Sequence, residues 1–438
     1  MGVFLAKPRI VKNLKIKMKN YNSKFKIFKN SFWLSGSQVV GRIIGFLYFI
    51  FLARSLAVDD FGVLAWVLGF VYNFYPLADF GIERLVLKKV SRAPEKADFY
   101  LEKLLPLRLI LAVFSVFVSL LLALFLGVFG EKLFLVFIFA VAVIPYNLLY
   151  LLAAAENAKE NFRPYAFAVV LTSFLSAGIG LVFIKMGLGL KWVLFAYCLS
   201  NIVTLWWGIR QIGHIYPLPR SPFGHLGSVF DLSFWKEILK EAWVFALIFI
   251  LAVFYLRIGL VLIGLVLGDY WAGIFGAAAK FFEAGILLPQ SIALALFPIS
   301  SKLFVEDKKK LGKVYLKGLA VLGTLGILGG TIMFFGGKFF IPLVYGQRYL
   351  PSVKIFSLSG ILMALFCLNS LPGNIIQNSE KVKKFLPLAV ANFLVAAAAC
   401  FWLIRRIGVI GGVWGMVIGE VFGLVVNNWF VYKILNEQ

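Results

Sequence analysis

The sequence predicts an all-α polytopic membrane protein, with about 12 transmembrane helices in two six-helix parallel repeats around a central cavity. Two observations lead to this fold class. The 438 residues are 61% hydrophobic with a mean hydropathy of +0.92, whereas globular proteins average about 45–50% apolar residues. Runs of roughly 20 apolar residues also recur along the chain, each long enough to cross about 30 Å of hydrocarbon as a helix. A membrane barrel would instead need strands of about ten residues with strict alternation.

The apolar runs form two groups of six, which divides the chain into four parts. Residues 1–30 form a basic segment, 31–212 the first half, 213–240 a polar linker and 241–438 the second half. The expected spans are 32–54, 62–82, 106–127, 132–154, 164–185, 191–211, 241–267, 272–298, 315–336, 354–376, 385–404 and 411–433.

The net charge of +24 would suggest a nucleic-acid partner in a soluble protein. Most of the 44 lysines and arginines, however, lie in loops on the side of the spans where the first span begins. This is the pattern of the positive-inside rule. We therefore expect a multi-pass protein of the cytoplasmic (inner or cell) membrane with both termini cytoplasmic and no nucleic-acid partner. The basic segment 1–30 is expected to lie on the anionic inner leaflet of the bilayer.

A short internal echo relates the two halves. The stretch "LAVDDFGVLA" (56–65) matches "LGDYWAGIFG" (267–276), which pairs Leu56 with Leu267 and Gly62 with Gly273. Because each repeat contains six spans, both repeats have the same orientation, related by an axis along the membrane normal. Two such halves can rock about a central cavity, which indicates a transporter.

Charged residues inside spans are the candidate binding residues. An arginine at mid-bilayer costs about 2.5–3.5 kcal/mol on insertion scales, yet Arg42 and Arg257 lie in the corresponding first spans of the two halves. We expect both to face a water-filled cavity. Lys280 and Glu283 share a helix face and are expected to pair. Since a guanidinium fork matches phosphate oxygens, Arg42, Arg257 and Lys280 predict binding of a phosphorylated anion.

The remaining polar residues give further predictions about coupling, snorkelling, metal binding and disulfides. Asp79, Glu283 and Glu420 are candidates for proton or sodium coupling. Snorkelling to the membrane surface explains the charges near span ends, Arg54, Arg108 and Lys354. No metal site is expected at His214 and His225, which have no other ligands nearby, and the three cysteines imply no disulfide framework.

No cofactor is expected, because the chain has no phosphate-binding loop of the Gly-x-x-x-x-Gly-Lys-Ser/Thr type. The membrane potential supplies about 2.3 kcal/mol per charge per 100 mV to an anion that leaves a negative interior. An anionic substrate could thus be exported without ATP.

The stretch "SQVVGRIIGFLYFIFLARSLAVDDFGVLA" (37–65) resembles the opening helix pair of the polysaccharide-transporting flippases, often called Wzx-type, of the MOP superfamily. A second stretch, "LVLGDYWAGIFGAAAKFFE" (265–283), is similar to the counterpart of that pair in the second half. The resemblance covers nearly the whole chain. The positions that match the family's gating or structural motif are Ala53, Arg54, Leu56, Asp59, Asp60, Gly62 and Gly273.

This resemblance implies a non-enzymatic flippase for a lipid-linked oligosaccharide, in which a diphosphate joins the glycan to a polyprenol. The glycan headgroup would enter an inward-open cavity while the prenyl chain stays in lipid between the halves. Expected partners are the bilayer and the polysaccharide polymerase and glycosyltransferase machinery, and the protein is expected to be a monomer. Kinks at Pro76, Pro289 and Pro298 would permit the rocking motion.

Three other functions stay open on the sequence alone. A cation-coupled multidrug exporter of the MATE type would need more buried carboxylates than cations, whereas the spans hold three of each. A lipid II flippase typically has about fourteen spans. A membrane glycosyltransferase or polymerase would need clustered acids in a loop, and the longest internal loop offers only Asp231 and Glu237.

Overall fold

The computed structural model describes residues 33, 36–213, 230–379 and 381–436. The basic segment 1–30, His214 and His225 lie outside these residues, so the predictions made for them stay predictions. Within the described ranges, twelve helical segments are long and apolar enough to cross a membrane, which confirms the expected all-helical class. These segments are Gly36–Ser55, Val58–Arg92, Pro94–Phe125, Gly130–Ala158, Arg163–Lys185, Leu190–Gln211, Leu232–Val266, Asp269–Glu306, Lys308–Tyr345, Ser352–Asn378, Val382–Ile407 and Ile410–Asn436.

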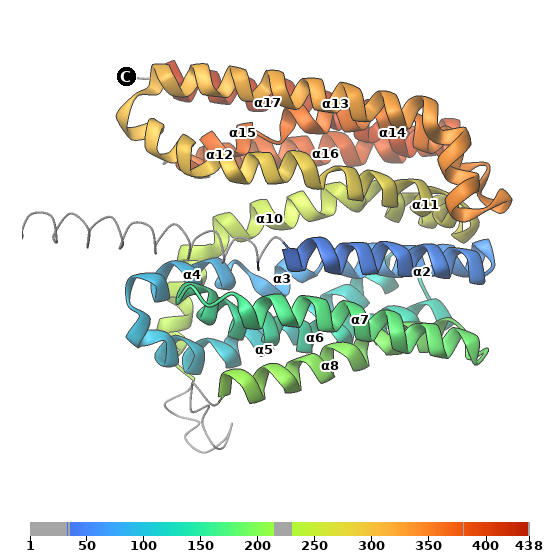
Figure 1. Cartoon of the computed structure of the whole chain (residues 1–438), viewed down its shortest axis with the longest axis horizontal. Coiled ribbons are helices and arrows are strands. Elements are labelled where there is room, and N and C mark those ends of the chain that lie inside the picture. Colours follow the sequence, from blue (N-terminus) through green and yellow to red (C-terminus); the bar gives the residue numbers. More distant parts are fainter. Residues whose placement is uncertain (1–32, 34–35, 214–229, 380, 437–438) are drawn as a thin grey trace, which may run out of the picture.

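The helices form two halves, one below and one above in Figure 1, which meet along the first helix, α2, α10 and α11. The first half contains the first helix (Gly36–Ser55), α2 (Val58–Tyr72), α3 (Tyr75–Asp79), α4 (Ile82–Arg92), α5 (Ala97–Phe125), α6 (Gly130–Ala158), α7 (Arg163–Lys185) and α8 (Leu190–Gly213). The second half contains α10 (Leu232–Val266), α11 (Asp269–Gly285), α12 (Leu287–Glu306), α13 (Lys308–Tyr345), α14 (Ser352–Asn369), α15 (Pro372–Asn378), α16 (Val382–Ile407) and α17 (Ile410–Asn436).

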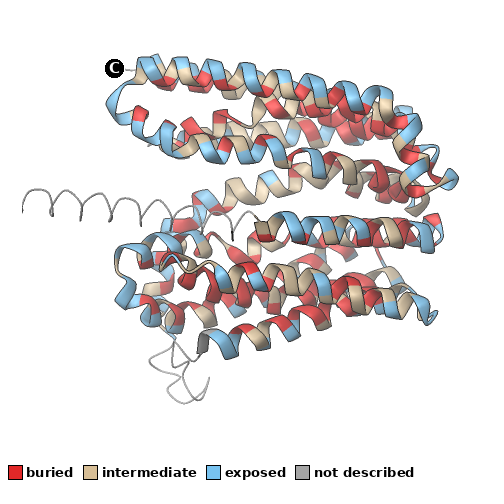
Figure 2. Ribbon diagram, in the orientation of Figure 1, coloured by how far each residue is buried: buried red, intermediate tan, exposed pale blue. Residues whose placement is uncertain are grey.

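We name the two ends of the bundle by the first helix. The near side, at the left of Figure 1, is where that helix begins and where α17 ends. The far side, at the right, is where the first helix leads into α2 and α10 leads into α11. Exposed residues lie mainly along the outward faces of the helices, and buried residues concentrate within each half and where the halves meet (Figure 2).

Three spans are broken beside prolines. α2 gives way to α3 just before Pro76, α11 to α12 at Ile286 before Pro289, and α14 to α15 next to Pro372. Proline lacks an N–H and clashes with the preceding helical turn, which accounts for breaks at these places. The expected interruptions near Pro76 and Pro289 are confirmed. At Pro298, α12 continues without a break.

The second half begins earlier than expected. α10 starts at Leu232, not at 241, and the Asp231 side chain caps it by accepting a hydrogen bond from the Phe234 N–H at 3.0 Å. Its first turns alternate lysine and glutamate with buried Trp235 and Ile238. A search for continuous apolar runs misses such an amphipathic start.

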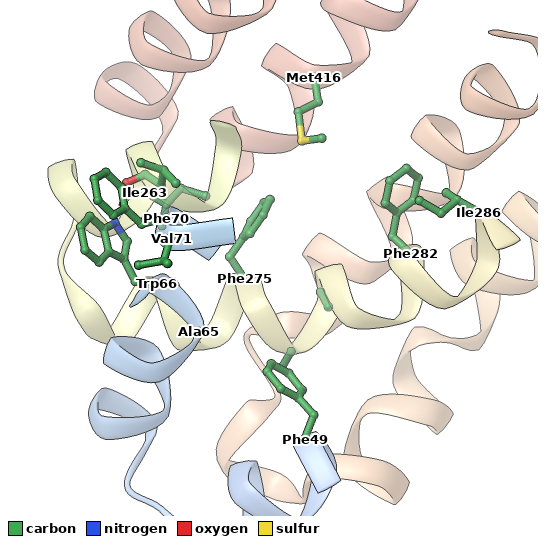
Figure 3. Close-up of a cluster of buried hydrophobic side chains, with 14 of the residues drawn as sticks. Phe49, Ala65, Trp66, Phe70, Val71, Ile263, Phe275, Phe282, Ile286 and Met416 are labelled. Carbon is green, nitrogen blue, oxygen red and sulfur yellow. Dashed lines mark hydrogen bonds between the residues drawn. The ribbon is translucent and has the colours of Figure 1, made fainter. Parts of the chain in front are cut away.

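Aromatic packing fills the contact between the halves. Trp66 and Phe70 of α2 stack with ring centroids 4.8 Å apart, next to Ile263 of α10 and Phe275 of α11 (Figure 3). The Trp66 indole N–H donates to the carbonyl of Val261 at 3.0 Å across the boundary. The indole N–H is therefore hydrogen-bonded although the ring is buried.

Gly62 and Gly273, which the internal echo pairs, lie against each other. A Cβ on Gly62 would stand 1.7 Å from the Asp269 carbonyl oxygen, and one on Gly273 would stand 2.5 Å from that of Val58. Only glycine fits either position. Equivalent residues that touch each other lie close to the axis that relates two repeats, so this contact supports the two-repeat interpretation.

Candidate functional site

A cavity of about 780 Å³ lies between the two halves. Its wall is formed by helices of both halves. The first half contributes the first helix, α2, α3, α6, α7 and α8, and the second half contributes α10, α11 and the start of α12. The first helix contributes residues from Gln38 to Phe49, and α7 contributes its early turns from Tyr165 to Ser176. The lining thus runs from the middle of the bundle to the near side.

Four charged side chains line the cavity within the part of the chain that the structure describes: Arg42, Arg257, Lys280 and Glu283. The prediction that both arginines face a cavity is confirmed, and each half supplies one of them. Three cations against one carboxylate leave an excess of positive charge. A role in substrate binding stays a prediction.

Lys280 and Glu283 form the expected ion pair, with Nζ and Oε2 2.9 Å apart. Lys280 also lies 5.0 Å from the centre of the Phe49 ring, and the Arg257 guanidinium lies 5.5 Å from that of Tyr72. Glu283 interacts electrostatically with Lys280, Arg257 and Arg42. Among the described residues, neither arginine has a carboxylate within 4.0 Å. Their N–H groups are therefore available to a ligand.

Tyrosines from the first half make up much of the remaining wall. Tyr146 and Tyr150 of α6 lie with ring centroids 4.3 Å apart, and the row continues to Tyr75 on one side and Tyr165 on the other at 5.3 and 5.4 Å. Such rings combine a flat apolar face with a hydroxyl that hydrogen-bonds. Sequence reasoning did not anticipate Tyr146 and Tyr165. The i, i+4 spacing of Tyr146 and Tyr150 was the available signal.

Asp79, a predicted coupling residue, lies outside the cavity in an ion pair with Arg108. Arg108 is fully buried and Asp79 is 4% exposed, so the expectation that Arg108 snorkels to the surface is wrong. The helix break places Asp79 against α5. Its carbonyl accepts a hydrogen bond from Arg108 at 2.9 Å, and its carboxylate also accepts from the Gly81 and Glu83 N–H groups. This geometry indicates a structural role.

Removal of the Arg108 side chain is expected to destabilise the protein. The Arg108→Ala variant leaves the Asp79 carboxylate buried without its cation, which costs about 3–5 kcal/mol when a buried pair loses one partner. We expect a lower apparent melting temperature of the purified protein in detergent micelles. The exposed Lys185→Ala variant serves as the control and should melt like the wild type. Equal melting of Arg108→Ala and wild type would contradict a structural pair.

Glu420 also lies outside the cavity, in the core of the second half. It is 4% exposed, and its carboxylate accepts a hydrogen bond from the Asn369 amide at 2.5 Å. The nearby Tyr255 hydroxyl, which interacts electrostatically with Glu420, donates to the Met416 carbonyl at 3.3 Å. The same Asn369 amide lies 2.8 Å from the Glu420 carbonyl oxygen. Of the three candidate coupling residues, only Glu283 lines the cavity.

The far side is closed by contacts between the halves, which we call the far-side closure. Arg54 donates to the carbonyls of Leu343 and Val344 at the end of α13, at 2.5 and 2.7 Å. Lys132 of α6 forms an ion pair with Asp269 of α11. Further contacts are the Gly62–Gly273 approach and the hydrogen bond from the Tyr349 hydroxyl to the Ala53 carbonyl at 3.0 Å.

The predicted gating motif is thus only partly in this closure. Arg54, Gly62 and Gly273 make contacts across the halves. Asp59 and Asp60 are exposed in the first turn of α2, where carboxylates favourably face the positive end of the helix dipole. Because the lining of the cavity reaches the near side while the far side is closed, the cavity is directed toward the near side.

Comparisons with known proteins agree with this architecture. The model of the family described as "Polysaccharide biosynthesis protein" matches residues 27–304. The "Probable low-salt glycan biosynthesis flippase Agl15" of Haloferax volcanii is 22% identical over 347 residues, which cover 75% of this chain and 70% of the relative.

Two solved structures share the fold. One is an inward-facing multidrug resistance MATE family transporter of the MOP superfamily, with a TM-score of 0.69 and 15% identity over 90% of this chain and 95% of the other. The lipid II flippase MurJ in an inward closed conformation gives a TM-score of 0.66 and 14% identity, over 92% and 88% of the two chains.

Proposed function

This chain belongs to the polysaccharide biosynthesis protein family, and from that premise we propose that it is a flippase for a polyprenyl-diphosphate-linked oligosaccharide. In this proposal it moves the glycan headgroup from the cytoplasmic to the outer leaflet by alternating access. The observation that carries the proposal is the cationic cavity between the halves, with Arg42 from one half and Arg257 from the other. The near side, where the cavity is directed, is then the cytoplasmic side, as the distribution of Lys and Arg indicates.

The chemistry of the lining suits a diphosphate. An arginine fork can donate two parallel hydrogen bonds to phosphate oxygens, and such charge-assisted bonds are roughly twice as strong as neutral ones. Lys280 adds a point charge beside them, while Glu283 leaves the set with an overall positive charge. The tyrosine row beyond the arginines offers ring faces and hydroxyls to sugar rings. A cationic drug would meet repulsion in the same cavity.

The driving force in this proposal is the membrane potential. A diphosphate that moves outward from a negative interior gains about 2.3 kcal/mol per charge per 100 mV. Any proton or sodium coupling would act through Glu283, the candidate carboxylate that lines the cavity.

Reconstitution tests the proposed function directly. Purified protein in vesicles, with a tritium-labelled polyprenyl-diphosphate oligosaccharide in both leaflets, should expose the inner-leaflet glycan to an external glycosidase that cannot cross the bilayer. We expect nearly complete cleavage with the protein present and only the outer-leaflet fraction without it. Cleavage that does not depend on the protein, together with protein-dependent uptake of a cationic dye, would favour the multidrug exporter.

A further inference from the structure

A second pocket, of about 580 Å³, lies on the other side of the α11–α12 break from the cationic cavity. It is a groove between the break, α13 and α14, and its lining is almost entirely apolar. This volume lies within the roughly 300–1,000 Å³ of pockets that bury small-molecule ligands. Residues that line it include Phe281, Leu288, Gly329, Ile332, Met333 and Met363.

The groove and the cavity are adjacent at the break. Ala284 and Leu287, one on each side of Ile286, line both of them. Glu283, near the end of α11, lines the cavity and pairs with Lys280. Gly285 and Leu288, on either side of Ile286, line the groove. A molecule with a charged end and an apolar end could therefore lie across the break with each end in matching surroundings.

The groove is open to the surroundings of the bundle at membrane level. Ile332 on α13 is 60% exposed and Leu288 on α12 is 54% exposed, although both line the groove. An apolar chain in the groove would thus be partly covered by protein and partly in contact with lipid.

We propose that this groove binds the isoprenoid chain of the substrate while its diphosphate lies at Arg42, Arg257 and Lys280. The inference rests on the proposed function and adds a site to it, because the chain is then held on the second half and does not lie free in lipid between the halves. Three observations carry it: the shared lining at Ala284 and Leu287, the change from charged to apolar surroundings across one helix break, and the opening to the membrane. The isoprenoid chain is favoured over a phospholipid acyl chain because the groove lies next to the cavity that holds Arg42, Arg257 and Lys280, where a diphosphate would bind.

The test measures how the affinity for isoprenoid diphosphates depends on the length of the isoprenoid chain, with and without a bulky side chain that fills the groove. The Ile332→Trp variant places an indole in the groove. The matched control is Ile327→Trp, since Ile327 lies on the same helix and is 63% exposed but does not line the groove. Binding of inorganic diphosphate and of geranyl, farnesyl and geranylgeranyl diphosphate is measured on the purified full-length protein in nanodiscs.

We expect affinity to rise with each isoprene unit in the wild type and in Ile327→Trp, since every unit buries further apolar area. In Ile332→Trp the affinity for geranylgeranyl diphosphate should fall by about tenfold or more, while that for inorganic diphosphate is unchanged. A steep rise with chain length that persists in Ile332→Trp would overturn the groove site and leave the proposed function intact. A wild type that binds no diphosphate at all would overturn both.

A photo-crosslinker identifies the occupant. With p-benzoylphenylalanine at position 332, illumination should label the isoprenoid chain of the bound diphosphate, and position 327 should not. Labelling of nanodisc phospholipid alone, or of a second copy of the chain, would overturn the assignment of the groove to the substrate.

Discussion

Replacement of both Arg42 and Arg257 by alanine is expected to abolish transport of the lipid-linked glycan while the protein still accumulates in the membrane. Hydrogen bonds to charged groups contribute about 1.5–3 kcal/mol each. Loss of one such contact per arginine should lower the affinity for the diphosphate by a factor between roughly a hundred and more than ten thousand. The measurement is complementation of a flippase-null strain, with protein levels determined in the same cells.

Folding should tolerate this double change. Arg42 is exposed to the cavity and Arg257 is half-buried, and neither has a carboxylate partner within 4.0 Å among the described residues. Their removal leaves no buried charge unpaired, in contrast to the loss of Arg108. Glu283 keeps its partner Lys280 in the variant. A loss of transport would therefore report on the substrate and not on misfolding.

Two further variants sharpen this experiment. Arg405→Ala with Arg406→Ala removes the same two charges at the far end of α16, where the side chains lie against Phe401 and Trp402, and transport should persist. Arg42→Lys with Arg257→Lys keeps the charge but loses the planar fork, so partial transport is expected. Full complementation by the double alanine variant would refute a diphosphate site at these residues.

The sequence predicts the membrane-spanning helices well, because an apolar run of this length is typical of a membrane span and of little else. In lipid, the backbone N–H and C=O groups of a run of about 20 apolar residues must bond to each other, which makes the run a helix. All twelve expected spans have a helical counterpart. The echo of Gly62 with Gly273 even anticipates a contact, because equivalent residues near a repeat axis meet each other. The start of α10 at Leu232 was missed because its first turns are amphipathic.

Charged residues were harder to place, since the sequence gives their depth in a span but not their partner. Arg42 and Arg257 were placed correctly because they had no acid one turn away. Arg108 lies near an expected span end, as a snorkelling residue would, yet its partner Asp79 comes from another helix. Glu420 likewise finds Asn369 and Tyr255 on other helices. Partners from separate helices depend on tertiary packing, which periodicity within one helix cannot reveal.

A reversible crosslink across the far-side closure is expected to arrest transport completely. Alternating access requires the halves to separate on the far side, where Lys132 and Asp269 now form an ion pair. In the Lys132→Cys, Asp269→Cys variant, a short bis-methanethiosulfonate reagent should join the two cysteines and hold the cavity directed toward the near side. Transport in reconstituted vesicles should fall to the level without protein and return when a thiol reductant cleaves the bridge.

The structure provides the background and the control for this experiment. The native cysteines Cys198, Cys367 and Cys400 are all buried, so alanine replacements supply a background without competing thiols. The control pair is Lys302→Cys with Glu306→Cys, which lies within α12 alone. A bridge there joins no two halves and should leave transport unchanged. If a completely bridged Lys132–Asp269 pair still allowed full transport, the halves would not need to part at α6 and α11. The substrate would then have to cross by a route that leaves the Gly62–Gly273 contact closed, and a rocking mechanism for this chain would be untenable.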